Sequence, residues 1–363
     1  MAITRIGNPA IADQRGINFR NIIINGDQSI AQRGTSTSSL SSGATFGATD
    51  RFKLFGVTFG TWTMSQSTDV PTGQGFAKSL KMDCTTANGS LSADSQAQIS
   101  QGIEGQNLQY LKKGTSSAES LTWSFWTKSN KTGTYICQIR DIDNSRSISK
   151  SYTISSANTW EKKTITFPGD TTGALGNDND KSFEIRWWLV AGTNFTSGTL
   201  ATSWASETSA NNAVGQVNLA DSTSNEWYVT GAQLETGQVA SDFEFLPADV
   251  NLQRCQRYYW NYVNGTDNEI GIGAYISSSE LDVIIMFPQT MRGNPTLDIV
   301  TGSGYYKINR SGASDSFNSF SIARATKKSC LIYNVSEVSG TQGQAGEVLS
   351  GNSNAFLSFS SEL

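Results

Sequence analysis

Polar and apolar residues alternate along most of the chain, in short stretches separated by segments rich in Gly, Asp, Ser and Thr. Alternation with a period of two indicates strands that bury one face. Up to residue 235 the clearest stretches are RFKLFGVTFGTWTMSQS, SLKMDCTT, SQAQISQGI, SLTWSFWTKS, TYICQIRDID, SISKSYTIS, WEKKTITFP, FEIRWWLVAG and NEWYVTGAQLE. A further strand is expected at residues 22–24, closed by the turn dipeptide Asn25-Gly26. The pattern predicts an all-β fold, a jelly-roll β-sandwich of two sheets.

Alternation resumes after residue 263 with EIGIGAYISS, LDVIIMFPQT, YYKINRSG, FNSFSIARAT and SCLIYNVSEVSG. This region is about a hundred residues long, enough for a second, small β-sandwich domain. We therefore expect a jelly-roll domain at residues 21–247, a connecting helix at residues 248–262 and the small β domain at residues 263–363.

One stretch between the two β regions has a different spacing. Its apolar positions recur at steps of three and four, as on one side of a helix: Leu252, Cys255, Tyr259 and Tyr262. Pro247 precedes them and Asp249 has an N-cap side chain, so a helix is expected at about residues 250–259. So short a helix is marginal alone. Its apolar stripe is expected to pack on the protein's own sandwiches or on the same helix of neighbouring subunits.

The composition argues against several classes of function. The formal net charge is −4 with scattered Lys and Arg, which gives no basic field for a nucleic acid. The sequence has no His, which excludes Ser-His-Asp and Cys-His catalysis and disfavours transition-metal sites. The four Cys residues form no CxxC pair and are expected to be buried, free thiols. We expect no enzyme activity and no cofactor.

The chain shows no signal for export or membrane insertion. Its first residues contain no apolar core of signal-peptide length, and no apolar run long enough to span a membrane follows. Synthesis in a cytoplasm is expected. Residues 1–20 have few apolar positions and predict an extended arm, either docked on another protein or frayed.

Several motifs, in their order along the chain, resemble those of bacteriophage tail fibre and receptor-binding proteins. They are NIIINGDQSIAQRG, TDRFKLF, LTWSFWTKS, WEKKTITFPGDTTG, GAQLETGQVASDFEFLP, LQRCQRYYW, FPQTMRGNPTL and FLSFSSEL. The resemblance implies a jelly roll similar to carbohydrate-binding modules, followed by a short helix and a small β domain. It also implies a virion protein made in the host cytoplasm, with residues 1–20 docked on a virion protein and a host-surface glycan as ligand. A capsid-attached fibre or decoration protein and a glycan depolymerase are the alternatives.

The same resemblance implies a homotrimer, because fibres of this kind are usually trimers. The helices are then expected near the threefold axis, with one apolar stripe forming the interface: Leu252, Cys255, Tyr259 and Tyr262. Self-packing of this stripe within one chain is the alternative.

Aromatic residues on strands supply the candidate glycan contacts. Alternation places Trp123 and Phe125 on one face of their strand and Trp126 on the other. In FEIRWWLV it separates a core-facing set (Phe183, Ile185, Trp187, Leu189) from a mixed set (Glu184, Arg186, Trp188, Val190). An exposed indole suits the apolar face of a sugar. The predicted glycan-binding residues are Trp126, Trp188, Trp227 and Arg186, with core packing as the alternative for each Trp; Trp62 and Trp204 are further candidates, on loops.

Carboxylates are numerous, but none marks a site. RDIDNS lacks the Gly and the distant Glu of an EF-hand loop. Asp27 and Glu235 lie near the expected ends of the sandwich, where sugar-binding jelly rolls often hold a structural calcium, and turn chemistry is the alternative. A glycosidase needs two converging carboxylates, which the sequence does not reveal.

Overall fold

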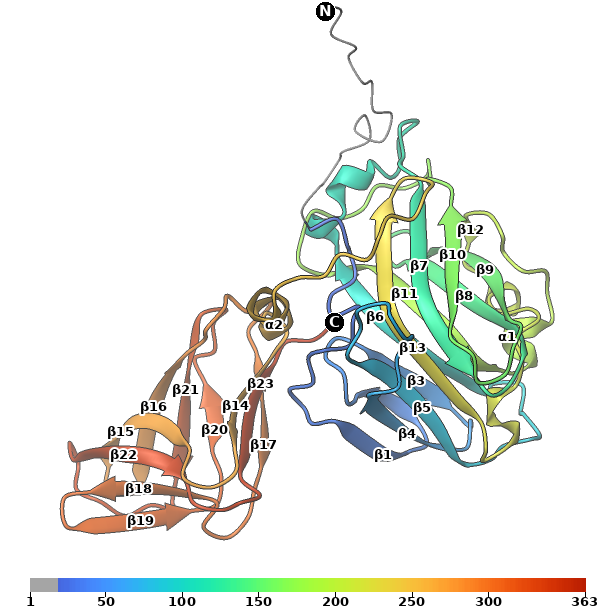
Figure 1. Ribbon diagram of the computed structural model, residues 1–363. Helices are drawn as coiled ribbons and strands as arrows, with labels where there is room; N and C mark the ends of the chain where they lie inside the picture. Colours follow the sequence, from blue (N-terminus) through green and yellow to red (C-terminus); the bar gives the residue numbers. More distant parts are fainter. Residues whose placement is uncertain (1–18) are drawn as a thin grey trace, which may run out of the picture. The chain divides into compact units, whose positions relative to one another are not determined.

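The computed structural model describes residues 19–363, and the chain divides between Leu246 and Pro247 into two compact units. Both consist of antiparallel sheets, so the all-β prediction is confirmed (Figure 1). The predicted arm at residues 1–20 lies outside the described residues except for Phe19 and Arg20.

The first unit is a sandwich of a six-stranded and a seven-stranded sheet. The six-stranded sheet has the order β1 (Ser36–Leu40), β4 (Thr61–Ser67), β5 (Ser79–Thr86), β13 (Glu226–Thr236), β7 (Leu121–Ser129) and β10 (Glu161–Phe167). The seven-stranded sheet has the order β12 (Ala205–Ser206), β9 (Arg146–Ile154), β8 (Gly133–Asp141), β11 (Lys181–Ala191), β6 (Gln96–Glu104), β3 (Lys53–Val57) and β2 (Gly43–Phe46). Connections include the short helices α1 (Thr193–Thr196), η1 (Gly105–Asn107), η2 (Gln109–Leu111), η3 (Ser209–Asn211) and η4 (Leu219–Asp221).

Aromatic side chains fill the space between these sheets. Trp187 of β11 lies with its ring centroid 4.5 Å from that of Trp123 on β7 and 6.1 Å from that of Trp227 on β13. Phe125, another inward residue of β7, meets Trp187 edge to face, with the ring centroids 5.5 Å apart. All four side chains are completely buried, as are Ile185 and Leu189, and Phe183 is nearly so. The predicted core face of β11 is confirmed, and Trp123 and Phe125 share one face of β7 as the alternation predicts.

Residues 22–24 do not form the expected strand. The N–H of Ile22 donates to the carbonyl oxygen of Leu234 on β13, but side chains bond the next two residues: Asn21 Oδ1 accepts from the N–H of Ile23, and Gln101 Oε1 accepts from the N–H of Ile24. At Gly26 the turn passes so close to β13 that a Cβ would lie 2.0 Å from the carbonyl oxygen of Ala232. Only glycine fits there. The turn at Gly26 therefore lies close against β13, and Ile22, Ile23 and Ile24 before it are buried.

The second unit pairs a three-stranded and a seven-stranded sheet. The smaller has the order β14 (Tyr259–Asn264), β23 (Phe356–Ser360) and β17 (Thr296–Val300). The larger has the order β19 (Ala313–Phe317), β18 (Tyr306–Arg310), β22 (Ala345–Ser350), β15 (Glu269–Ser277), β16 (Glu280–Met286), β21 (Ser329–Val335) and β20 (Ser321–Ala323).

The predicted helix is present but shorter than expected. Helix α2 (Ala248–Gln256) follows Pro247, which occupies the N-cap position without a side-chain cap, so Asp249 is in the first turn and the predicted N-cap is wrong. None of the helices in residues 19–363 has the length and apolar character needed to cross a membrane.

The apolar stripe does not continue along this helix. Tyr259 and Tyr262 belong to strand β14, which pairs with β23. Cys255 and Tyr259 are buried, and the Tyr259 hydroxyl donates to Asp298 Oδ2 of the same unit at 3.0 Å. Leu252 and Tyr262 are half-buried, and the Tyr262 hydroxyl donates to the carbonyl oxygen of Ile270. The predicted subunit interface is therefore wrong for Cys255 and Tyr259, because both are already buried within a single chain; the homotrimer stays a prediction.

All four cysteines are free and buried, as the sequence predicts. Burial raises the pKa of the Cys84 thiol to about 11 and that of Cys330 to about 12, and it also raises the pKa of Cys137. Since the thiolate is the reactive form, we expect the folded protein to resist a thiol reagent at mildly alkaline pH. The same reagent should label all four residues in denaturant. Rapid labelling of a thiol in the folded protein would contradict this expectation.

Candidate functional site: a charged face on the first unit

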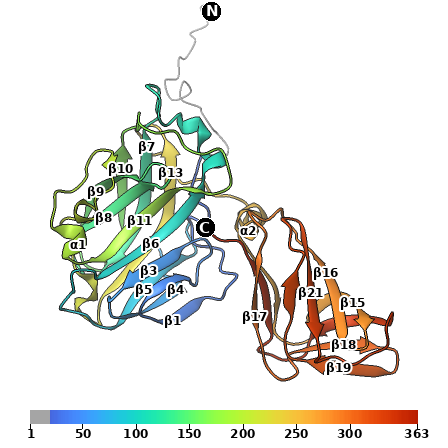
Figure 2. The same cartoon turned by 180° about the vertical axis from the view of Figure 1, so that it is seen from behind.

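The seven-stranded sheet (Figure 2) carries a cluster of ion pairs on its outward side. In the strand register Glu184 of β11 lies opposite Arg140 of β8, and Arg186 lies opposite Gln138. On the other side of β11, Arg186 faces Ser100 of β6, which pairs in turn with Lys53 of β3. We call this surface the charged face; its ionic members are Lys53, Arg140, Lys181, Glu184, Arg186 and Glu207.

Glu184 is the centre of this face. Its carboxylate lies 2.5 Å from Arg186 Nη2, 3.2 Å from Lys181 Nζ, 3.4 Å from Arg140 Nη1 and 3.6 Å from Lys53 Nζ. Burial by itself would raise the pKa of this carboxyl, but the surrounding cations outweigh burial and lower the pKa to about 2. Glu184 is therefore ionised at any physiological pH.

Cations outnumber carboxylates on the charged face. The face has two carboxylates, Glu184 and Glu207, and four basic side chains. The carboxylate of Glu207 lies 2.5 Å from Arg140 Nη2. Glu104, opposite Lys181 in the register, is completely buried and accepts a hydrogen bond from Gln106. Since the protein as a whole is acidic, this face is a local site of positive charge.

Two buried donors on the face have no acceptor. Gln138 Oε1 accepts from Trp188 Nε1 at 3.3 Å, which leaves the amide Nε2 as a donor, and this atom has no partner. Arg140 Nε is also buried without a partner, although its Nη atoms are paired. Buried donors are normally satisfied, and an unsatisfied one costs about 1–3 kcal/mol. Both atoms are buried, so a bridging water, and not an external ligand, is the acceptor that suits them.

The structure corrects the prediction that Trp188 lies on an accessible sheet face. It is completely buried, in a small cluster with Ile136, Ala191 and Ala213. Its ring centroid lies 5.3 Å from that of Phe195, in α1. The segment after β11 folds back over this end of the charged face, and strand alternation cannot predict such a cover.

The other predicted aromatic contacts have different positions. Trp227 belongs to the inter-sheet core, so its predicted exposure is wrong as well. Trp62 is a buried residue of β4 rather than a loop residue. Trp126 is half-buried on the outward side of the six-stranded sheet, and Trp204 is a half-buried loop residue that donates to the carbonyl oxygen of Pro168. Of the four predicted contacts, only Arg186 is an accessible part of the charged face.

The calcium candidates have other partners. Glu235 is nearly buried, accepts hydrogen bonds from Ser241 and lies 3.6 Å from Arg20 Nε. Asp27 Oδ1 accepts from the N–H of Ser29 at 3.5 Å. Within residues 19–363, no three carboxylate or thiol side chains gather in a metal-binding arrangement. The structural calcium stays a prediction.

Sequence reasoning missed Gln138, Arg140 and Glu207. A signal for the first two was present, because in YICQIRD the polar Gln138 and Arg140 alternate with core residues, as Glu184 and Arg186 do in FEIRWW. Nothing in the sequence indicated that the two polar sets would be neighbours. Glu207 follows a two-residue edge strand and gave no signal.

No protein-family model and no curated protein matches the sequence. Among solved structures, the enzymatically active domain of tailspike protein 4 of bacteriophage CBA120 is similar at a TM-score of 0.32 and 15% identity, with 60% of this chain and 22% of that chain covered. TmCBM61 in complex with β-1,4-galactotriose is similar at a TM-score of 0.30 and 10% identity, with 60% of this chain and 99% of that chain covered. A family 11 carbohydrate-binding module of Clostridium thermocellum is similar at a TM-score of 0.26 and 14% identity, with 56% of this chain and 95% of that chain covered. At scores and identities this low, no family is assigned to the chain.

Proposed function

We propose that the chain is a non-enzymatic adhesin of a tailed-phage virion, carried in the tail fibre, and that its charged face binds an acidic glycan of the host surface. The observation that supports the glycan site is the excess of cations on the charged face, where four basic side chains surround Glu184. Sugar hydroxyls and carboxylates are the acceptors that such a surface lacks. The virion role rests on the order of the tail-fibre motifs along the chain, with residues 1–20 as the docking segment.

A depolymerase role has less support at this site. A glycosidase needs one carboxylic acid that can give a proton to the leaving group. The low pKa of Glu184 keeps it ionised, and Glu207 is bound to an arginine. A purely binding role fits both carboxylates better.

Arg186→Gln is expected to weaken binding to carboxylate-bearing polysaccharides about tenfold or more, since a hydrogen bond to a charged group contributes about 1.5–3 kcal/mol. The measurement is a glycan array of acidic and neutral polysaccharides, followed by titration calorimetry at two salt concentrations. Lys162→Gln removes the same charge from an exposed position on β10, in the other sheet, and should leave binding unchanged.

Equal binding by Arg186→Gln and the wild type, or a preference for neutral sugars, would contradict the acidic-glycan site. Melting temperatures of both variants show whether a loss of binding reflects a loss of folding. Antibody labelling of virions in the electron microscope tests the location separately, because label on the capsid instead of the tail would favour a capsid fibre or decoration protein.

A further inference from the structure

The chain enters the first unit beside the segment by which it leaves this unit. Residues 237–246, which we call the connector, lead from the end of β13 towards helix α2 (Figure 1). The first described residues lie against the same strand, because the N–H of Ile22 donates to the carbonyl oxygen of Leu234 and the N–H of Leu234 donates to Asn21 Oδ1. The beginning and the end of this unit therefore meet at β13.

Arg20 and Asn21 bind the connector by hydrogen bonds. Arg20 Nε donates to Ser241 Oγ at 2.8 Å, and Arg20 Nη2 donates to the carbonyl oxygen of Asp242 at 2.6 Å. The backbone N–H of Asn21 donates to Glu244 Oε2 at 2.9 Å. Each of these bonds involves an ionised side chain, and such bonds are stronger than those between neutral groups. We call the two residues Arg20 and Asn21 the clasp.

Strand β13 binds the connector through its own side chains. Gln233 Oε1 accepts from the N–H of Glu244 at 2.8 Å, and Glu235 Oε1 accepts from the N–H of Ser241 at 2.9 Å. Arg20 Nε also lies 3.6 Å from Glu235 Oε2. Two backbone amides of the connector are thus protected from hydrogen exchange while the connector lies on β13.

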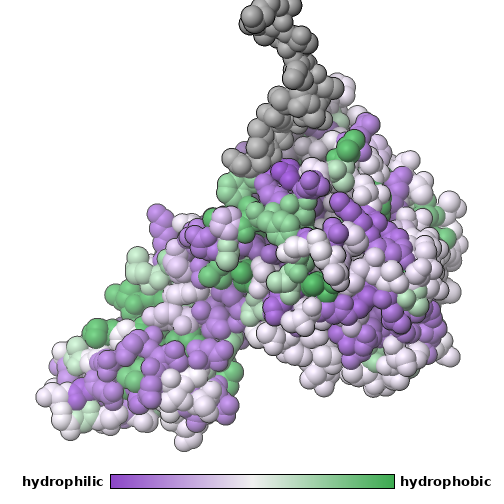
Figure 3. All heavy atoms as spheres, viewed as in Figure 1, coloured by the Kyte–Doolittle hydropathy of each residue, from purple (hydrophilic) through white to green (hydrophobic). Residues whose placement is uncertain are grey.

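Apolar packing attaches the connector only in part. The ring of Phe243 packs on Phe76 with centroids 5.1 Å apart, but Phe245 is 52% exposed and Val239 is 80% exposed. Figure 3 shows hydrophobic surface where the connector crosses the first unit. A segment with few buried apolar contacts opens locally at a lower free energy than the core unfolds. The hydrogen bonds of the clasp therefore contribute much of what keeps the connector in place.

We propose that the clasp controls the link between the two units: closed, it keeps the connector on the first unit, and open, it frees the connector as a tether. A freed connector reaches up to roughly 35 Å. Arg20 belongs both to the clasp and to the docking segment proposed above. A partner that binds this guanidinium through a carboxylate therefore opens the clasp, because the connector uses the same Nε and Nη2 atoms. This trigger rests on the proposed docking of residues 1–20, whereas the clasp itself does not.

Hydrogen exchange of the full chain, measured by mass spectrometry, tests the clasp. Arg20→Ala should raise the exchange rate of the connector amides about tenfold or more, since it removes bonds from a charged donor. Peptides from the core strands β7 and β11 should exchange as in the wild type. Lys162→Ala is the matched control, because it removes an exposed charge from β10 of the sheet on which the connector lies, and it should change nothing.

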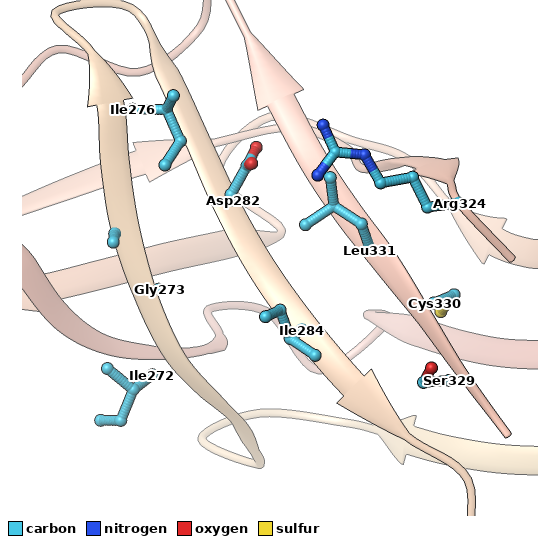
Figure 4. Close-up of a pocket in the computed structure, with 10 residues that line it drawn as sticks. Ile272, Gly273, Ile276, Asp282, Ile284, Arg324, Ser329, Cys330 and Leu331 are labelled. Carbon is cyan, nitrogen blue, oxygen red and sulfur yellow. The ribbon is translucent and has the colours of Figure 1, made fainter.

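The apolar attachment is tested in the same way. Phe243→Ala removes the ring that packs on Phe76 and should also raise exchange in the connector. Ile284→Ala is its control. That side chain is 73% exposed, in a hollow of about 400 Å³ on the second unit (Figure 4), and its loss should leave the connector unchanged.

Two results overturn the clasp. One is unchanged connector exchange in Arg20→Ala, and the other is an equal rise throughout the first unit, which indicates a general loss of stability. Chymotrypsin provides a second measurement, because an opened connector should be cleaved after Phe243 faster than in the wild type.

The trigger is tested on purified virions. The connector of the docked wild-type chain should be cleaved by chymotrypsin faster than that of the free chain. Equal or slower cleavage of the docked chain overturns the trigger. A chain that is absent from virions contradicts the proposed function and with it the trigger, while the exchange result for Arg20→Ala still decides the clasp.

Discussion

Replacing Glu184 by Gln should lower the free energy of unfolding by about 3 kcal/mol at neutral pH. The carboxylate is almost completely buried, and four cations approach it within 3.6 Å. Its pKa of about 2, against an ordinary value of 4.5, corresponds to a stabilisation of about 3 kcal/mol. Gln keeps the size of the side chain but leaves Arg186 and its neighbours without their shared counter-charge. Urea denaturation measures the difference.

The effect should depend on pH in a defined direction. The pKa of Glu184 is lower in the folded protein than in the unfolded chain. Its stabilising contribution is therefore complete above about pH 4.5 and is lost as the pH falls towards about 2. Wild type and Glu184→Gln should then converge in stability at the acid end of this range.

Glu226→Gln is the control for this prediction. Glu226 also pairs with a lysine, Lys81, at 2.6 Å, but its side chain is 35% exposed. Exposed ion pairs contribute about 0–1 kcal/mol, so this substitution should have a small effect. Equal losses in the two variants would show that burial of the ion cluster at Glu184 has no special energetic role.

Trp188→Ala should lower the free energy of unfolding by about 3–5 kcal/mol, the usual loss for a large aromatic side chain removed from a core. The indole is completely buried, packs on Phe195 and donates to Gln138. Its removal leaves a cavity under the segment that follows β11, and it also frees the Gln138 amide. Thermal and urea denaturation measure the loss.

Trp126→Ala provides the comparison, because Trp126 is only half-buried on the outward side of the other sheet. Trp126→Ala should lower the free energy of unfolding clearly less than Trp188→Ala does. If Trp188→Ala instead melted like the wild type and lost glycan binding, Trp188 would be a ligand contact and the cover over it would have to open. The pair of variants separates these two roles.

Alternation along single strands was enough to predict the all-β class and the inward residues of β11. Ile185 and Trp187 were assigned to the core, and Trp123 and Phe125 to one face of their strand, from spacing alone, because a strand projects successive side chains to opposite faces whatever its neighbours are. The change of spacing after Pro247 likewise located helix α2. These features depend on residues close together in the chain.

Tertiary structure decided which of these faces meets solvent. Trp188 was assigned to an outward side correctly, yet a later segment covers it, and Tyr259 continued a helical spacing but pairs as a strand with β23. The charged face joins Lys53, Arg140 and Glu184 from strands far apart in sequence. Periodicity fixes the side of a strand on which a residue lies, whereas its neighbours across the sheet and the cover above it depend on long-range pairing, which single-strand periodicity does not encode.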